Sequence, residues 1–136
     1  MATTITIEQW RDRLARMVRS GAIRKGLEVA ATTLAMEGQR HAAFGVTNAP
    51  GGLRVRSGAL RRSLAGITET KGETVSVVLS SGGKSGFGAV PYARRHEEGT
   101  HGMRKRPFLQ PALVHISRHA DKVISTEIAR VLEGGR

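Results

Sequence analysis

The chain has no cysteine and very few aromatic residues. Without cysteine it can form neither a disulfide bond nor a thiolate metal site, which agrees with folding in a reducing cytoplasm. Aromatic residues make up only 4% of the sequence, too few for a row of side chains on which single-stranded nucleic acid stacks. No window approaches the roughly 18 consecutive apolar residues that a membrane span requires. The first ten residues also lack the apolar run of a signal peptide.

Acidic residues are scarce as well. The chain has 22 Lys and Arg against 11 Asp and Glu, which gives a formal net charge of +11. Such a charge favours anionic partners: nucleic acid first, then an anionic membrane or an acidic protein surface. Arginine outnumbers lysine, and its guanidinium group suits bidentate contacts to carboxylates or phosphates. The length of 136 residues predicts one domain, 1–136, with a core of moderate size.

The first third of the chain is predicted to be helical, from about residue 6 to 43. Thr6 and Gln9 have the spacing of a capping box, and apolar residues then recur at helical intervals. Gly21 interrupts this pattern before it resumes, so we expect one broken or kinked helical region. Strong helix breakers in residues 48–52 end the region.

Sheet and loops are predicted for about residues 53–106, and a C-terminal helix for about 111–132. Residues 67–70 and 74–80 predict a β-hairpin, since the second segment alternates with the period of a half-buried strand. Pro111 suits the first position of the C-terminal helix, whose apolar residues form one stripe. The predicted fold is therefore α+β. It has an N-terminal helical region, a small antiparallel β-sheet with a hairpin, and a long amphipathic C-terminal helix packed on the sheet.

Three segments between these elements are predicted to be less regular. Residues 57–62 are expected to form a short turn or the start of a helix. The glycine- and serine-rich segment 81–88 is predicted to be a flexible loop. Residues 92–100 are expected to form a polar turn broken by glycine, ahead of the C-terminal helix.

No catalytic site is indicated. Gly83-Lys84-Ser85 resembles the end of a phosphate-binding loop, but Val78 stands where that pattern requires its first glycine. No serine lies in a nucleophile-elbow pattern. Neighbouring carboxylates in the sequence, Glu97 and Glu98, would diverge in a helix or strand. We therefore expect a protein that is not an enzyme.

Two groups of histidines could be considered as metal ligands, but neither matches an established ligand spacing. The groups are His96, Glu97, Glu98 and His101, and the i,i+4 pair His115 and His119. The second pair lacks the glutamate of the zincin motif, and Arg118 between its members would oppose a bound cation. We therefore expect structural or solvated histidines, and no metal or other cofactor.

Basic residues gather in two clusters, which are candidate contacts to other subunits or to DNA. The clusters are Arg54, Arg56, Arg61 and Arg62, and Arg94, Arg95, Arg104, Lys105 and Arg106. They could form a solvated surface balanced by carboxylates of this and other subunits. They could equally face phosphates and bind nucleic acid without sequence preference. No helix-turn-helix or RNA-binding signature decides between the two interpretations.

An ordered set of short motifs resembles a known family. The motifs are Pro50, Ser57-Gly58-Ala59-Leu60-Arg61-Arg62-Ser63, the hairpin, Tyr92-Ala93, Glu97/Glu98-Gly99-Thr100 and Arg106-Pro107-Phe108-Leu109-Gln110-Pro111-Ala112-Leu113. In this order they resemble the small neck or tail-completion proteins of tailed double-stranded-DNA bacteriophages, related to the lambda minor tail protein Z. The resemblance covers about residues 50–132. Ser57 stands where the family has threonine, and Glu97, two residues before Gly99, best fills the family's glutamate position.

The resemblance implies a non-enzymatic virion subunit at the head–tail junction. Such a subunit forms a ring, expected to be a hexamer, assembled in the bacterial host cytoplasm. Its partners would be copies of itself, head-completion, tail-terminator or tail-tube proteins, and double-stranded DNA in the channel, with no membrane. The motif residues expected to shape the turn and seat the C-terminal helix are Ser57, Gly58, Leu60, Tyr92, Glu97, Gly99, Thr100, Pro107, Phe108 and Pro111. The alternative is a stand-alone basic, cytoplasmic nucleic-acid-binding module.

Overall fold

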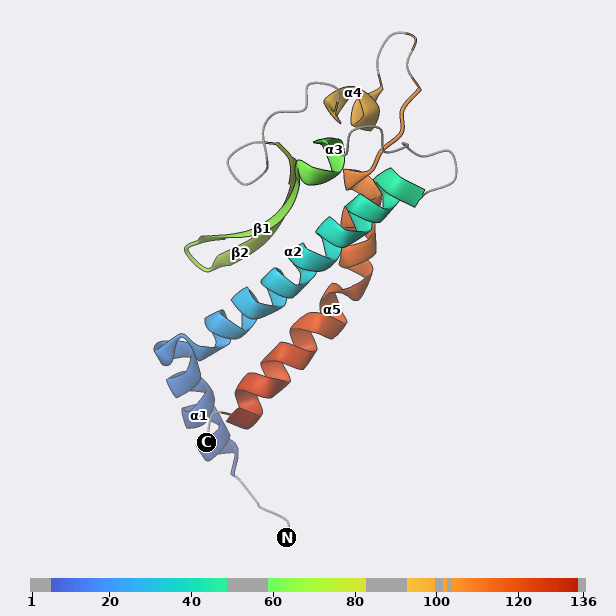
Figure 1. The fold of residues 1–136 in the computed structure, drawn as a ribbon. Helices are drawn as coiled ribbons and strands as arrows, with labels where there is room; N and C mark the ends of the chain where they lie inside the picture. The colour runs from blue at the N-terminus through green and yellow to red at the C-terminus, as the bar shows by residue number, and fades with distance from the viewer. Residues whose placement is uncertain (1–5, 49–58, 83–92, 100–101, 103, 135–136) are drawn as a thin grey trace.

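The computed structural model describes residues 6–48, 59–82, 93–99, 102 and 104–134. The predicted α+β fold is confirmed: helices, a two-stranded antiparallel sheet and a long C-terminal helix that packs on α2 and the sheet (Figure 1). In chain order the elements are α1 (Ile7–Ser20), α2 (Ala22–Asn48), α3 (Ala59–Arg62), β1 (Leu64–Lys71), β2 (Thr74–Ser81), α4 (Ala93–Glu98) and α5 (Leu109–Gly134).

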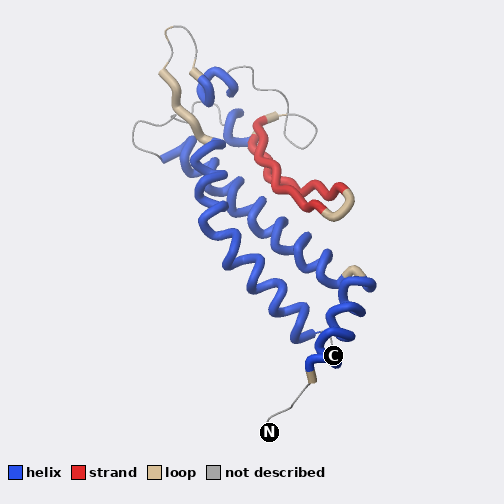
Figure 2. Tube along the Cα trace, turned by 180° about the vertical axis from the view of Figure 1, so that it is seen from behind, coloured by secondary structure: helices blue, strands red, loops and turns tan. Residues whose placement is uncertain are grey.

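The two long helices, α2 and α5, run antiparallel and side by side along the molecule (Figures 1 and 2). They have 27 and 26 residues, so each is about 40 Å long. Glycines allow their close approach: a Cβ on Gly26 would lie only 2.8 Å from Val131 Cγ2, and one on Gly38 would lie 3.4 Å from Ile116 Cδ1. Glycines that weaken an isolated helix are therefore used for packing in this fold.

The break in the N-terminal helical region lies at Gly21, as predicted. Its φ of 76° is left-handed, and its N–H bonds to the carbonyls of Met17 and Val18, which ends α1. The capping box also forms, because Gln9 N donates to Thr6 Oγ1 and Thr6 N donates to Gln9 Oε1. The helical region extends about five residues beyond the predicted end near residue 43 and reaches the predicted helix breakers of residues 48–52. Helix α2 continues to Asn48, since Val46 is buried in the core.

The hairpin is confirmed, and β1 begins at Leu64, three residues earlier than predicted. The strands pair from Leu64↔Ser81 to Lys71↔Thr74, so only two residues form the turn. The first of them, Gly72, has a φ of 58°, which glycine adopts without strain. Strand β1 lies directly on α2 at Gly66, whose N–H donates to Gln39 Oε1 at 3.0 Å.

Helix α5 begins at Leu109, two residues before the predicted start. Pro111 is therefore the third helical residue, still in the first turn, where no N–H is needed for an intrahelical bond. The segment expected to be an irregular turn contains the short helix α4, which ends at Gly99 with a φ of 75°. Among the described residues, no helix combines the length and apolar character needed to cross a bilayer.

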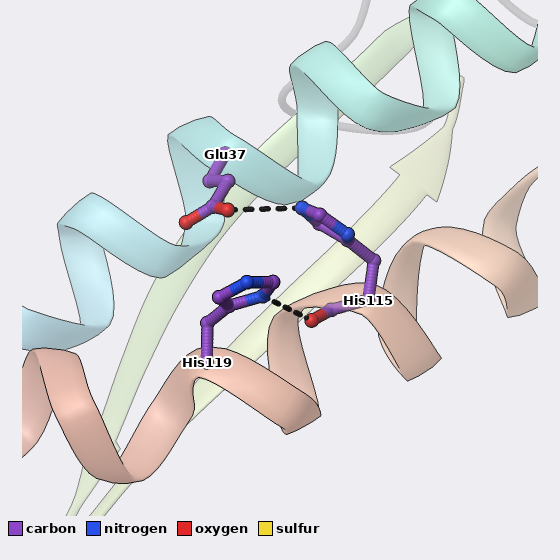
Figure 3. A group of neighbouring side chains, drawn as sticks. All are labelled: Glu37, His115 and His119. Atoms are coloured by element: carbon purple, nitrogen blue, oxygen red, sulfur yellow. Dashed lines mark hydrogen bonds and ion pairs between the residues drawn. The ribbon is translucent and has the colours of Figure 1, made fainter.

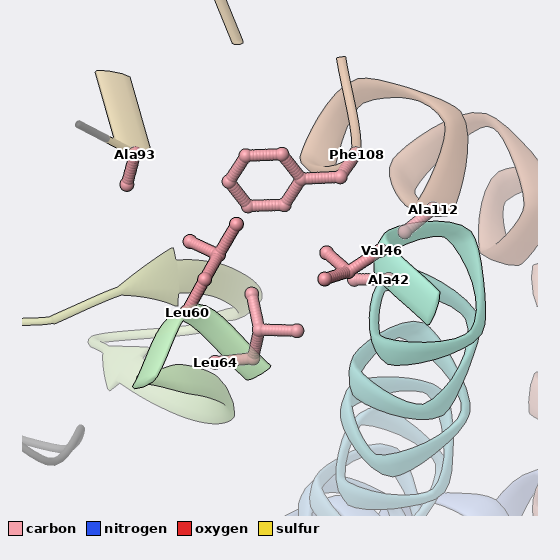
Figure 4. Close-up of a cluster of buried hydrophobic side chains, with 7 residues drawn as sticks. All are labelled: Ala42, Val46, Leu60, Leu64, Ala93, Phe108 and Ala112. Atoms are coloured by element: carbon pink, nitrogen blue, oxygen red, sulfur yellow. The ribbon is translucent and has the colours of Figure 1, made fainter. Parts of the chain in front are cut away.

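A hydrophobic core lies at the end of the molecule where α2 ends and α5 begins. There α2, α3, β1, α4 and the start of α5 meet, and Figure 4 shows the side chains pointing toward one another. Its members are Ala42, Val46, Leu60, Leu64, Ala93, Phe108 and Ala112.

Candidate functional site

Glu97 caps the N-terminus of α5. Its Oε2 accepts the N–H groups of Phe108 at 2.8 Å and Leu109 at 3.0 Å, and its Oε1 accepts that of Gln110 at 2.9 Å. Pro111 comes next and has no N–H, so the first turn has no unsatisfied donor up to that residue. A carboxylate also interacts favourably with the positive end of the helix dipole. Helix α4, which carries Glu97, therefore positions the start of α5.

Residues 104–106, just before α5, lie against α4 and Gly99. Arg106 N donates to the carbonyl of His96 at 2.7 Å. A Cβ on Gly99 would lie 3.3 Å from the backbone nitrogen of Lys105, and its positive φ also favours glycine. Burial lowers the pKa of His96 from its ordinary value of 6.5, and the nearby Arg106 guanidinium lowers that pKa further.

Buried side chains attach α3, α4 and the hairpin to the end of the molecule where α5 begins. Phe108 is 3% exposed and packs with Leu60 of α3 and Ala93 of α4 (Figure 4). Ser63 is fully buried, and its hydroxyl bonds to the Leu60 carbonyl at 2.6 Å and to Ser81 Oγ at 2.7 Å. These contacts join α3, α4, the hairpin and the start of α5 into one unit.

The elements of this unit carry many exposed basic residues. Seven exposed cationic side chains come from α3, from α4 and from the segment before α5, and we call them the basic end: Arg61, Arg62, Arg94, Arg95, Arg104, Lys105 and Arg106. Arg94 pairs with Glu98 at 2.9 Å. Within the part of the chain that the structure describes, the other six have no ion pair. The basic end thus presents unneutralised positive charge to solvent.

The structure brings together most, but not all, of the residues singled out from the sequence. Leu60, Glu97, Gly99 and Phe108 belong to the unit beneath the basic end, and Pro107 and Pro111 flank the start of α5. The remaining predicted residues lie outside the described residues: Arg54, Arg56, Ser57, Gly58, Tyr92 and Thr100.

A second polar cluster lies midway along α2 and α5. Glu37 and His41 on α2 face His115 and His119 on α5 (Figure 3). His115 Nε2–H donates to Glu37 Oε1 at 2.9 Å, and His119 Nδ1–H donates to the His115 carbonyl at 2.9 Å. The α5 pair was recognisable in the sequence from its i,i+4 spacing. The missed signal was a second i,i+4 pair, Glu37 and His41, on the other long amphipathic segment.

His41 completes this cluster from the α2 side. Its ring stacks on that of His115, with centroids 4.3 Å apart and planes 20° apart. Burial lowers the pKa of His41 from 6.5, and His115 lowers it further, while Glu37 acts in the opposite direction. His41 Nδ1 is buried and has no hydrogen-bond partner among the described residues.

No protein-family model, curated protein or solved structure matches this chain. Its function must therefore be inferred from the chemistry of these two clusters and from the motif resemblance.

Proposed function

We propose that the protein is a structural subunit of the head–tail junction of a tailed bacteriophage. It forms a ring that helps to join the tail to the DNA-filled head. The observation that carries this proposal is the basic end, where three separate segments contribute seven exposed cations, of which Arg94 alone has a carboxylate partner among the described residues. Such a surface favours an anionic partner, either phosphates or the carboxylates of a neighbouring protein.

The packing beneath the basic end supports the proposal. The motifs that resemble the neck and tail-completion family lie far apart in the sequence, yet Leu60, Ala93, Phe108 and Ala112 share one core. Glu97 of one motif caps the helix that begins within another. The described motif residues thus pack into one unit that carries exposed cationic side chains.

A ring would multiply this charge around a central axis. Repeated cationic surfaces that face a channel would bind DNA by releasing its counterions, without reading the base sequence. Surfaces that face another ring would instead pair with its carboxylates, for which arginine is suited. Both arrangements depend on exposed arginines, and neither needs a catalytic group.

Exposed apolar side chains support contacts between subunits. Along α1, Ile7 is 84% and Val18 is 65% exposed, and Phe44 on α2 is 62% exposed. Trp10 and Leu14, also exposed, continue the row from Ile7 to Val18 at helical spacing along α1, and a continuous exposed apolar surface commonly marks an interface. In the proposed assembly a neighbouring copy of the chain covers them.

Charge reversal at the basic end tests the proposed role. The variant Arg104→Glu/Lys105→Glu should fold normally, because both side chains are exposed, but should reduce the yield of infectious particles by at least about tenfold. The matched control is Arg24→Glu/Lys25→Glu, an adjacent exposed pair near the start of α2. Equal particle yields from wild type and the Arg104/Lys105 variant would refute the role of this surface. Native mass spectrometry of the purified chain, without DNA, should show one discrete oligomer.

The second candidate is a stand-alone nucleic-acid-binding module, which the exposed charge of a single chain also favours. This alternative predicts a monomer that binds double-stranded DNA tightly and loses affinity steeply with salt. A discrete ring with weak DNA binding outside the assembled particle favours the virion subunit.

A further inference from the structure

We propose that Glu37, His115 and His119 bind one divalent transition-metal ion, best matched by Zn²⁺, which links α2 to α5. This site lies on the long helices, away from the basic end, and it does not depend on the function proposed above.

The spacing of the three side chains suits a single ion. One ligand atom from each, a carboxylate oxygen and two imidazole nitrogens, lies within 4.8 Å of the others. Ligands bound at about 2.0 Å in tetrahedral geometry are about 3.3 Å apart. The ligand atoms therefore have to approach one another by at most about 1.5 Å, a distance that side-chain rotations can cover. Glu37 and His115 are about one-third exposed and His119 is exposed, so an ion can enter from solvent.

The existing hydrogen bonds prepare both histidines for coordination. A carbonyl can only accept, so the bond from His119 Nδ1 to the His115 carbonyl places the His119 proton on Nδ1. The lone pair of His119 Nε2 is then available for a metal, and this kind of bond is common behind histidine ligands. His115 Nε2 already points at Glu37 Oε1 (Figure 3). In the bond to Glu37 the proton of His115 lies on Nε2. When an ion takes the place between Nε2 and Oε1, the proton of the neutral His115 ring lies on Nδ1 instead.

The surroundings hold the ligands in place without competing for the ion. The ring of His41 stacks on that of His115 and restricts its rotation. Arg118, which argued against a metal when only the sequence was considered, is exposed, so water screens its charge. Glu37 supplies one negative charge directly at the proposed site.

The donor set favours zinc-like ions over magnesium or calcium. Two imidazoles and one carboxylate are typical ligands of Zn²⁺, with water in a fourth position, whereas Mg²⁺ and Ca²⁺ prefer oxygen ligands alone. Since the ion joins residues on two helices, it should stabilise the folded chain by mass action.

Titration of the purified full chain with ZnCl₂ tests the proposal. Isothermal titration calorimetry should give one ion per chain, and at an ion concentration of about 100 Kd the Tm should rise by about 5–10 °C. CoCl₂ should give the visible absorption bands of a four- or five-coordinate site, and MgCl₂ should have no effect. Binding of Zn²⁺ weaker than about 1 mM, or of several ions per chain with equal affinity, would overturn the proposal.

Variants locate the site. His119→Gln removes an exposed ligand and should weaken Zn²⁺ binding at least about tenfold, with an unchanged circular dichroism spectrum. His96→Gln, which removes a histidine on α4, is the matched control and should bind like wild type. If His119→Gln fails to fold, Glu37→Gln gives the same comparison. Wild-type affinity in both variants would show that these side chains are not ligands.

Discussion

At the scale of single residues, the most informative contact is the cap that Glu97 forms on α5. The sequence pattern favoured Glu97 over Glu98 for the motif position, and their contacts differ accordingly. Glu97 accepts three backbone N–H groups of the α5 start, whereas Glu98 pairs with Arg94 on the surface. The sequence could not predict the cap itself, because the carboxylate and the helix start are separated by eleven residues and meet only in the folded chain.

Glu97→Ala should destabilise the protein by about 1–3 kcal/mol, because it removes a helix cap and leaves partly buried N–H groups unpaired. The control Glu98→Ala loses only an exposed ion pair and should cost about 0–1 kcal/mol. Urea denaturation monitored by circular dichroism measures both changes. Equal losses in the two variants would contradict the capping role.

At the scale of elements, the features that depend on neighbouring residues were predicted correctly. The features that depend on contacts between distant elements were not. The capping box at Thr6, the break at Gly21 and the hairpin depend on neighbouring residues, so periodicity and turn chemistry were sufficient. The length of α2 and the helical form of α4 depend on burial of Val46 and Ala93 in the shared core. No local pattern contains that information.

The interior glycines illustrate the same difference. Gly26 and Gly38 each weaken an isolated helix by about 1 kcal/mol relative to alanine. In the fold each lies against a side chain of another element, Val131 for the first and Leu79 for the second, where a Cβ would be too close. Their contribution is close packing, which could not be inferred before the partner elements were known.

Gly66→Ala should be strongly destabilising, by about 3 kcal/mol or more. An added Cβ would lie 2.1 Å from the backbone oxygen of Ala35, so β1 would have to move away from α2. Gly45→Ala is the control, because a Cβ there meets nothing within 4 Å and alanine favours a helix. Thermal unfolding should show a lower Tm for the first variant and an equal or higher Tm for the second. An unchanged Tm for Gly66→Ala would mean that β1 does not lie this close to α2.

At the scale of the whole molecule, α3, α4 and the segment before α5 bring seven of the basic residues to the same end. The sequence predicted two basic clusters, and the structure brings α3, which carries Arg61 and Arg62 of the first, to the same end as the elements that carry the second. This convergence follows from the core under α3 and α4, so it was not visible in the order of residues. The cluster of Glu37, His41, His115 and His119 could not be predicted for the same reason. Two of its residues lie on α2 and two on α5, and they meet only in the folded chain.

Overall stability should fall on mild acidification. The pKa of both His41 and His96 is lowered in the folded state, chiefly by burial. The unfolded chain therefore binds protons first as the pH falls below about 6.5, which favours unfolding until the pH reaches the folded-state pKa values. Above about pH 6.5 these two groups add no pH dependence. Urea denaturation at about pH 7.5 and pH 5.5 measures the effect.

The double variant His41→Gln/His96→Gln should show a smaller loss of stability between these two pH values than wild type. A wild-type protein that becomes more stable at the lower pH would contradict the burial of the two imidazoles.

The first and last helices also meet, since the Arg13 guanidinium donates to the carbonyl of Leu132. The start of α1 and the end of α5 consequently lie at the end of the molecule opposite the basic end (Figures 1 and 2). A fusion partner, an affinity tag or a fluorophore attached through either terminus would be anchored on that far side. The protein could be immobilised through either terminus and would still offer its arginines to a ligand in solution.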